Sequence, residues 1–132
     1  MTHSVELLRS ASLADAAYAH AASAVAGKTL LFLAGACPLD TRGDIVAVGD
    51  YGAQAAQCIA NLRAALQEAD ASLNDVVNTR VLVASSARED LVTAWEVVRD
   101  AFQPHDPPST LLGVTVLGYD HQLVEVEAVA AI

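Results

Sequence analysis

The sequence predicts an α+β fold in which a mixed β-sheet of about six strands carries two helices on one face. Short apolar segments typical of strands occur together with two long segments whose apolar residues recur every three or four positions, as on a half-buried helix. Hydrophobic residues make up 54% of the 132 residues and charged residues only 17%. The chain can therefore fill the core of a single domain that covers residues 1–132.

Three strands are expected before the first helix. Residues 5–8 are apolar enough for a short strand, and residues 29–34 form a continuous apolar run, which predicts a strand covered on both faces. The Ala-rich segment 11–26 fits either a loop or a helix. Residues 38–44 are rich in turn-forming residues, and residues 45–48 are predicted to form a short strand after that turn.

Two helices are predicted from their caps and their periodicity. Asp50 can cap a helix over residues 51–69, and Ser86–Glu89 has the spacing of a capping box for a second helix, which Pro104 ends. The expected inward face of the first helix is Ala55, Cys58, Ile59, Leu62, Ala65 and Leu66. The apolar stripe of the second is Leu91, Ala94, Trp95, Val98 and Phe102.

Three further strands complete the predicted sheet, at residues 76–84, 109–117 and 123–131. In the first of these, one face is expected to carry Val77, Thr79, Val81 and Val83, and the other Asn78, Arg80 and Leu82. Residues 109–117 are apolar on both faces: one has Thr110, Leu112, Val114 and Val116, the other Leu111, Gly113, Thr115 and Leu117. Two helices cover only one face, so the sequence predicts a homo-oligomer that packs the bare faces together.

Composition excludes several classes of partner. Seven Lys and Arg residues against sixteen Asp and Glu residues give a net charge of −9, so nucleic acid is not an expected partner. No apolar run approaches the roughly 20 residues of a membrane span, and the N-terminal region lacks a signal-peptide core, so we expect no membrane partner and a cytoplasmic location. Cys37, Cys58 and the four scattered histidines lack metal-site spacing, so no metal or cofactor is expected.

Glu125 and Glu127 are the residues most suggestive of chemistry. They lie two apart in the last strand and so point to the same face, while Val124, Val126, Ala128 and Ala130 fill the other. Carboxylates in an apolar strand are costly to bury. Two interpretations stay open: both can line a wet interface paired with an arginine, or one can hold a water or a substrate donor in an interfacial cleft.

Five segments, in order, resemble the Rid/YjgF (RidA-like) family, also called the endoribonuclease L-PSP family. They are FLAGACPLD at 32–40, the helical stretch 54–66 with Gln57 and Asn61-Leu62, DVV at 75–77, PPST at 107–110 and LVEVEA at 123–128. The resemblance covers most of the chain from about Tyr18 onwards. It implies a chorismate-mutase-like fold and a homotrimer whose sheets form an inner barrel, with clefts between the subunits.

The resemblance also implies a chemistry, because active members of this family hydrolyse reactive enamines and imines to ketoacids and ammonia. Glu125 falls on the glutamate that positions the attacking water, and Tyr18 falls near a tyrosine of the cleft. Gly35 retains the glycine that ends the early strand. Ser109 stands where the family has the arginine that binds the substrate carboxylate, and Thr110 follows it in the cleft lining.

Ser109 alters the expected substrate. A charge-assisted hydrogen bond is worth about 1.5–3 kcal/mol, so its loss weakens carboxylate binding at least about tenfold. Two functions stay open. The first is a trimeric hydrolase of small reactive imines or enamines, with activity on 2-imino acids disfavoured. The alternative is a non-catalytic trimer that binds a small metabolite or a partner protein in the same clefts.

Overall fold

The computed structural model describes residues 3–132. Their elements are β1 (Val5–Leu8), β2 (Ala21–Ala24), β3 (Leu30–Phe32), α1 (Tyr51–Glu68), the short 3-10 helix η1 (Leu73–Asp75), β4 (Val76–Ala84), α2 (Arg88–Phe102), β5 (Ser109–Val114) and β6 (Val124–Ala131). The α+β class and both helices are as predicted. The helix α1 begins where expected, because the Asp50 side chain accepts a hydrogen bond from the backbone N–H of Ala53.

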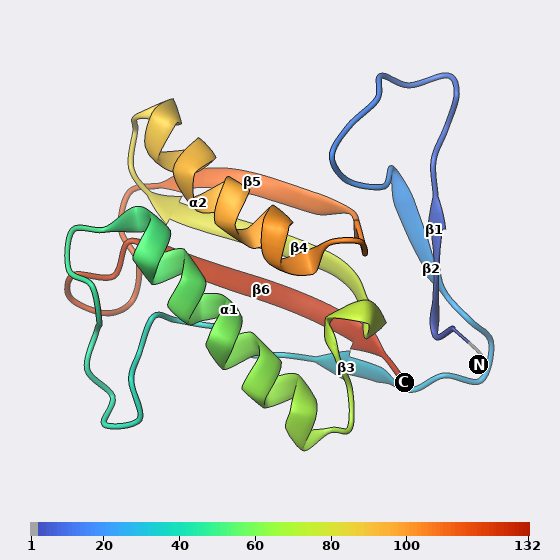
Figure 1. Ribbon diagram of the computed structural model, residues 1–132, viewed down its shortest axis with the longest axis horizontal. Coiled ribbons are helices and arrows are strands. Elements are labelled where there is room, and N and C mark those ends of the chain that lie inside the picture. The colour runs from blue at the N-terminus through green and yellow to red at the C-terminus, as the bar shows by residue number, and fades with distance from the viewer. Residues whose placement is uncertain (1–2) are drawn as a thin grey trace.

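The strands form two sheets. The main sheet has the order β3-β6-β4-β5, in which only the β4–β5 pair is parallel, and β1 and β2 make a separate antiparallel hairpin. Both helices lie on the same face of the main sheet, and the hairpin stands beyond the end of this sheet (Figure 1). The predicted arrangement of two helices on one face of a mixed sheet is therefore confirmed for four of the strands.

One predicted strand is wrong and one strand was missed. Residues 45–48 form no strand, and Ile45 makes only an isolated bridge to Leu39. The backbone is left-handed at Ala47 (φ 49°) and again at Gly49 (φ 83°), and this conformation interrupts extended pairing. The missing strand is β2, which comes from the Ala-rich segment and pairs with β1 along its whole length.

Two local predictions also fail. The capping box at Ser86–Glu89 does not form, since Ala87 is the N-cap of α2 and has no side-chain cap. Ser85 organises this turn instead: its Oγ accepts from the N–H of Ala87 at 3.0 Å and donates to Asp90 Oδ2 at 2.7 Å. In β4, an irregularity in the pairing with β6 puts Val76, rather than Val77, in the core.

The core lies between the two helices and the main sheet. Its buried residues include Ala55, Cys58, Ile59, Leu62 and Leu66 of α1, Ala94, Val98 and Phe102 of α2, and Val124, Val126, Ala128 and Ala130 of β6. Leu91 and Trp95 pack against it as partly buried residues. The predicted inward residue Ala65 is exposed, whereas the polar Gln54 is fully buried, with its amide bound to backbone groups of His121 and Leu123.

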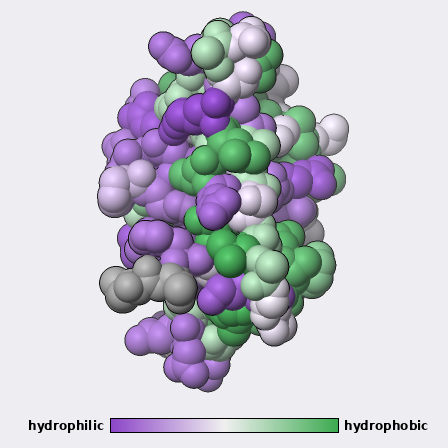
Figure 2. All heavy atoms as spheres, turned by 90° about the vertical axis from the view of Figure 1, so that its right-hand side faces the viewer, coloured by the Kyte–Doolittle hydropathy of each residue, from purple (hydrophilic) through white to green (hydrophobic). Residues whose placement is uncertain are grey.

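Neither helix covers the opposite face of the main sheet, which we call the open face. The strand registers place on it Leu30, Phe32, Asn78, Arg80, Leu82, Thr110, Leu112, Glu125, Glu127 and Val129. Phe32 is 77% exposed and Leu30 is 47% exposed, so β3 is not covered on both faces within one chain. Hydrophobic side chains also gather in a band between hydrophilic flanks at the hairpin end of the molecule (Figure 2).

Candidate functional site

Glu125 lies on the open face, opposite Leu82 of β4. Its Oε1 atom accepts two hydrogen bonds, from Sγ of Cys37 at 3.1 Å and from Nε2 of Gln122 at 3.2 Å. Within residues 3–132 no Lys, Arg or His side chain forms an ion pair with Glu125. The carboxylate is partly buried and is held by neutral donors alone.

The backbone of Gly35 lies against the carboxylate of Glu125. A Cβ atom built on Gly35 would lie 2.7 Å from the carboxyl carbon of Glu125 and would overlap its Oε2. Any larger residue at this position would therefore push the Glu125 side chain aside. The structure thus places the predicted site residues Gly35 and Glu125 in direct contact.

Cys37 contacts Glu125 and is not among the predicted site residues. Burial is the main cause that raises the pKa of Cys37 to about 11, and the hydrogen bond to Glu125 and the charge of Glu125 raise it in the same direction. The thiol therefore keeps its proton at neutral pH. It acts as a hydrogen-bond donor and lacks the thiolate that a nucleophile needs.

Glu127 has a different environment from Glu125. It is paired in register with Arg80, and the distance between Arg80 Nη1 and Glu127 Oε2 is 3.9 Å. Both side chains are about half exposed, so this is a loose surface ion pair. Thr110 lies on the other side of Arg80, in register on β5. The interpretation of an arginine-paired carboxylate thus describes Glu127, while Glu125 has no such partner in the described chain.

Tyr18, Ser109 and Thr110 meet at a second place, the edge hollow. This hollow of about 440 Å³ lies along β5, one of the two edge strands of the main sheet, and Trp95 and Leu111 complete its lining. The ring of Tyr18 packs edge-on against Trp95, with 6.2 Å between the ring centroids and 79° between the planes. The Oγ of Ser109 shares a hydrogen bond of 2.6 Å with Oγ1 of Thr79.

Arg9 anchors Tyr18 in this position. One of its terminal nitrogens, Nη1, donates to the backbone oxygen of Tyr18 at 3.0 Å, and the other, Nη2, forms an ion pair of 2.9 Å with Asp106. The backbone N–H of Ala19 also donates to the backbone oxygen of Asp106, at 2.9 Å. The loop between the hairpin strands is thereby tied to the segment before β5.

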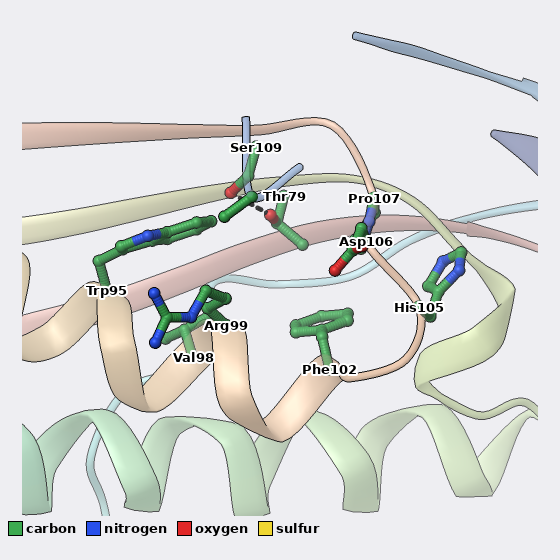
Figure 3. A pocket seen from close by; sticks show the side chains of 10 residues that line it. Thr79, Trp95, Val98, Arg99, Phe102, His105, Asp106, Pro107 and Ser109 are labelled. Atoms are coloured by element: carbon green, nitrogen blue, oxygen red, sulfur yellow. Dashed lines mark hydrogen bonds between the residues drawn. The ribbon is translucent and has the colours of Figure 1, made fainter. Parts of the chain in front are cut away.

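Arg99 lies close to the edge hollow and is not among the predicted site residues. A small cavity that shares Trp95 and Ser109 with the edge hollow is also lined by Arg99, Phe102 and Asp106 (Figure 3). Arg99 directs both Nε and Nη2 to Oδ1 of its neighbour Asp100, at 3.1 and 3.0 Å. Residues four apart share one side of a helix, so the spacing from Trp95 to Arg99 was a signal that could have revealed it.

A single chain does not bring the edge hollow and Glu125 together. β4 lies between β5 and β6, so the two strands are separated by roughly 10 Å, which is twice the spacing of neighbouring strands. Among residues 3–132 no cluster of three or more His, Cys, Asp or Glu side chains is placed to bind a metal ion. Over the same residues, neither helix combines the length and the hydropathy that crossing a membrane requires.

The sequence matches a family model and resembles two relatives of similar length. The family model described as Endoribonuclease L-PSP matches residues 9–132. A RutC family protein of Pyrococcus abyssi is 36% identical over 100 residues, which cover 76% of each chain. A RutC family protein of Pyrococcus horikoshii is 33% identical over 107 residues, which cover 81% of this chain and 82% of the relative.

Solved structures of Rid and YjgF family proteins resemble the chain over nearly its whole length. YyfB of Yersinia pestis, described as a protein of unknown function of the conserved Rid protein family, has a TM-score of 0.90 at 26% identity, with 98% of this chain and 99% of that chain covered. A member of the YjgF/YER057c/UK114 family from Mycobacterium tuberculosis has a TM-score of 0.66 at 27% identity, with 98% and 100% covered. The fold is therefore the chorismate-mutase-like fold that the resemblance to the Rid/YjgF family implied.

Proposed function

Because the chain belongs to the endoribonuclease L-PSP family, also called the Rid/YjgF family, we propose that it is a homotrimer that hydrolyses small reactive imines or enamines in clefts between its subunits. In this reaction water adds to the carbon of the C=N bond, and ammonia then leaves to give a carbonyl compound. Glu125 holds the attacking water and accepts its proton. Tyr18, Ser109 and Thr110 line the part of the cleft that binds the substrate.

The observation that carries this proposal is the environment of Glu125. A carboxylate paired with an arginine is a poor proton acceptor, whereas Glu125 has only the neutral donors Cys37 and Gln122 within hydrogen-bond distance in the described chain. Gly35 leaves room for the carboxylate against the backbone. Glu125 therefore has the features of a general base facing a solvent-accessible surface.

The trimer is supported by apolar surface and an unpaired sheet edge that one chain leaves uncovered. The open face exposes Phe32 and Leu30, and β5 ends the main sheet with an unpaired edge. The predicted site residues fall into two groups, around Glu125 and around the edge hollow, that lie two strands apart. Packing the open face of one subunit against the β5 edge of the next would join the two groups in one cleft.

The substrate class follows from the charges near the edge hollow. Ser109 offers a neutral hydroxyl that is already shared with Thr79. The cations near the edge hollow each have a carboxylate partner. Arg99 donates to Asp100, Arg9 pairs with Asp106, and Arg80 lies beside Glu127, so their charges are offset. The chain also carries a net charge of −9, which repels anions. We therefore expect neutral or cationic imines to be better substrates than 2-imino acids.

The test is an imine-decay assay with two substrate sets. An amino-acid oxidase generates 2-imino acids in place, an amine oxidase generates imines without a carboxylate, and semicarbazide traps what remains. We expect faster decay of the uncarboxylated imines with the protein present, and loss of that acceleration in Glu125→Gln. Glu127→Gln is the matched control, because it removes the same charge from the same face of β6.

Two outcomes would overturn parts of this proposal. If neither substrate set decays faster, the chain is not an imine hydrolase, and thermal shifts with ketoacids, amines or aldehydes would then favour the non-catalytic binding trimer. If sedimentation equilibrium gives the mass of one chain, the intersubunit cleft is wrong.

A further inference from the structure

Cys37 reaches Glu125 because of the pairing next to β3. Ala36 forms an isolated antiparallel bridge with Val126, so its neighbour Cys37 falls beside Glu125 on the open face. The Sγ atom lies 3.1 Å from Oε1 of Glu125, and the two residues are 88 positions apart in the sequence. This is a tertiary contact between the turn after β3 and the middle of β6.

Gln122 is the second donor to the same oxygen, and its own position is fixed. Its side chain is 4% exposed. Its Oε1 accepts from the backbone N–H of Tyr119 at 3.1 Å, and its Nε2 donates both to the backbone oxygen of Val124 at 3.1 Å and to Glu125 Oε1 at 3.2 Å. Glu125 Oε1 is therefore held between a thiol and an immobilised amide.

The second carboxylate oxygen, Oε2, is left for other partners. It lies over the backbone of Gly35, where a side chain would overlap it. No hydrogen bond to Oε2 of Glu125 is present within residues 3–132. One oxygen is thus immobilised and the other is available, an arrangement that limits rotation of the carboxylate about its last torsion.

The kind of donor matters for the chemistry. A protonated thiol and an amide orient a carboxylate without cancelling its charge, whereas an arginine would orient it and also weaken it as a base. The raised pKa of Cys37, about 11, keeps the thiol in the donor form across the neutral range. Cys58, on α1, is buried in the core and donates to the backbone oxygen of Val124, so it does not compete for Glu125.

We propose that Cys37 is a positioning residue which, together with Gln122, holds Oε1 of Glu125 so that Oε2 receives the proton of the attacking water. The catalytic part of this inference rests on the proposed function. The contact between Cys37 and Glu125 can be tested without it.

The first experiment measures the contact itself. The rate of alkylation of Cys37 by iodoacetamide is followed against pH by mass spectrometry, which separates the Cys37 and Cys58 peptides. In the unaltered protein the rate should rise only as the pH approaches the raised pKa of Cys37. Glu125→Gln removes the charge that raises this pKa, so its alkylation curve should shift to lower pH. Glu127→Gln should leave the curve in place, and equal curves for all three proteins would overturn the contact.

The second experiment measures positioning. In the imine-decay assay, Cys37→Ala should lower kcat about three- to tenfold with KM unchanged, as expected for the loss of one weak hydrogen bond to a reacting group. Cys37→Ser supplies a hydroxyl donor of similar size and should restore most of kcat. Equal kcat for all three proteins, or a Cys37→Ser variant as poor as Cys37→Ala, would overturn the positioning role.

If no imine is hydrolysed by the unaltered protein, the proposed function fails together with the catalytic role of Cys37, while the alkylation curves still decide the contact.

Discussion

Glu125 and Glu127 lie two residues apart on the same face of one strand, but their surroundings differ. Glu127 is about half exposed and lies 3.9 Å from Arg80 of the neighbouring strand β4, whereas Glu125 is held by a thiol and an amide over a glycine backbone. The difference arises from the neighbouring strands, because Cys37 and the backbone of Gly35 contact the Glu125 side chain, whereas Glu127 faces Arg80. Identical side chains in one strand can thus have different chemistry when their cross-strand neighbours differ.

The largest expected effect is on imine hydrolysis. Glu125→Gln should lower kcat by at least about 100-fold, since general base catalysis contributes roughly 10²–10⁴ to the rate. Glu127→Gln should stay within about threefold of the unaltered protein, because it loses only a surface ion pair. Initial rates of imine decay for the two variants measure the contrast. Similar losses in both would show that the two carboxylates are not functionally distinct.

A second substitution alters the position of Glu125 but not its identity. Gly35→Ala places a methyl group where the Glu125 carboxylate lies and should lower kcat about tenfold or more, because small misplacements of catalytic groups are costly. Gly52→Ala in α1 is the control, since its Cβ would meet its nearest neighbour, Thr93 Cγ2, at an ordinary 3.6 Å. That control should keep its activity and gain roughly 0.5–1 kcal/mol of stability. Loss of activity in both would point to a general effect on folding.

Alkaline pH should weaken the fold through the thiols. Burial, with a smaller contribution from Glu125, raises the pKa of Cys37 from 9.0 to about 11, and burial raises the pKa of Cys58 further. Between the unfolded and the folded values the unfolded chain has lost the proton and the native chain has kept it. The stabilising contribution is therefore complete below pH 9 and is lost as the pH rises toward 11. Urea unfolding midpoints from pH 7 to 10.5 should fall less steeply in Cys37→Ser, and parallel curves would contradict this linkage.

The smallest effect is expected at the ion pair beside Glu127. A double-mutant cycle with Arg80→Gln and Glu127→Gln should give a coupling energy below about 0.5 kcal/mol, because both side chains are about half exposed. Urea unfolding of the four proteins measures it. A coupling above about 1 kcal/mol would mean that Glu127 is held more firmly than its exposure indicates.

The sequence predicted those elements whose position depends on neighbouring residues in the chain, such as β6 and the start of α1. The alternation of Val124, Glu125, Val126 and Glu127 showed which residues of β6 face the helices, and Asp50 marked the start of α1. β2 was missed because its four residues, alanines and one serine, have no apolar alternation, and it exists through pairing with β1. Residues 45–48 have strand-like composition, but the left-handed backbone at Ala47 has no signature in an alanine.

The candidate site was predictable only in part. Glu125 stood out because two carboxylates in an apolar strand are unusual, whereas the role of Cys37 depends on a contact across 88 positions that no spacing rule reveals. Tyr18, Ser109 and Thr110 gather at the β5 edge, two strands away from Glu125 in the same chain, and their meeting with Glu125 in a cleft between subunits stays a prediction. Sequence patterns show which face a residue occupies and leave open which residues of distant segments meet on that face.

The separate hairpin has a consequence for access to the edge hollow. Tyr18 belongs to the loop that joins β1 to β2, while Trp95, Ser109 and Thr110 belong to α2 and the main sheet. In the described residues 3–132 no backbone ladder links the two sheets, and the walls are joined near Tyr18 by Arg9, Asp106 and one backbone hydrogen bond. A change in the tilt of the β1–β2 hairpin would therefore alter the width of the edge hollow while every ladder of the main sheet stays intact.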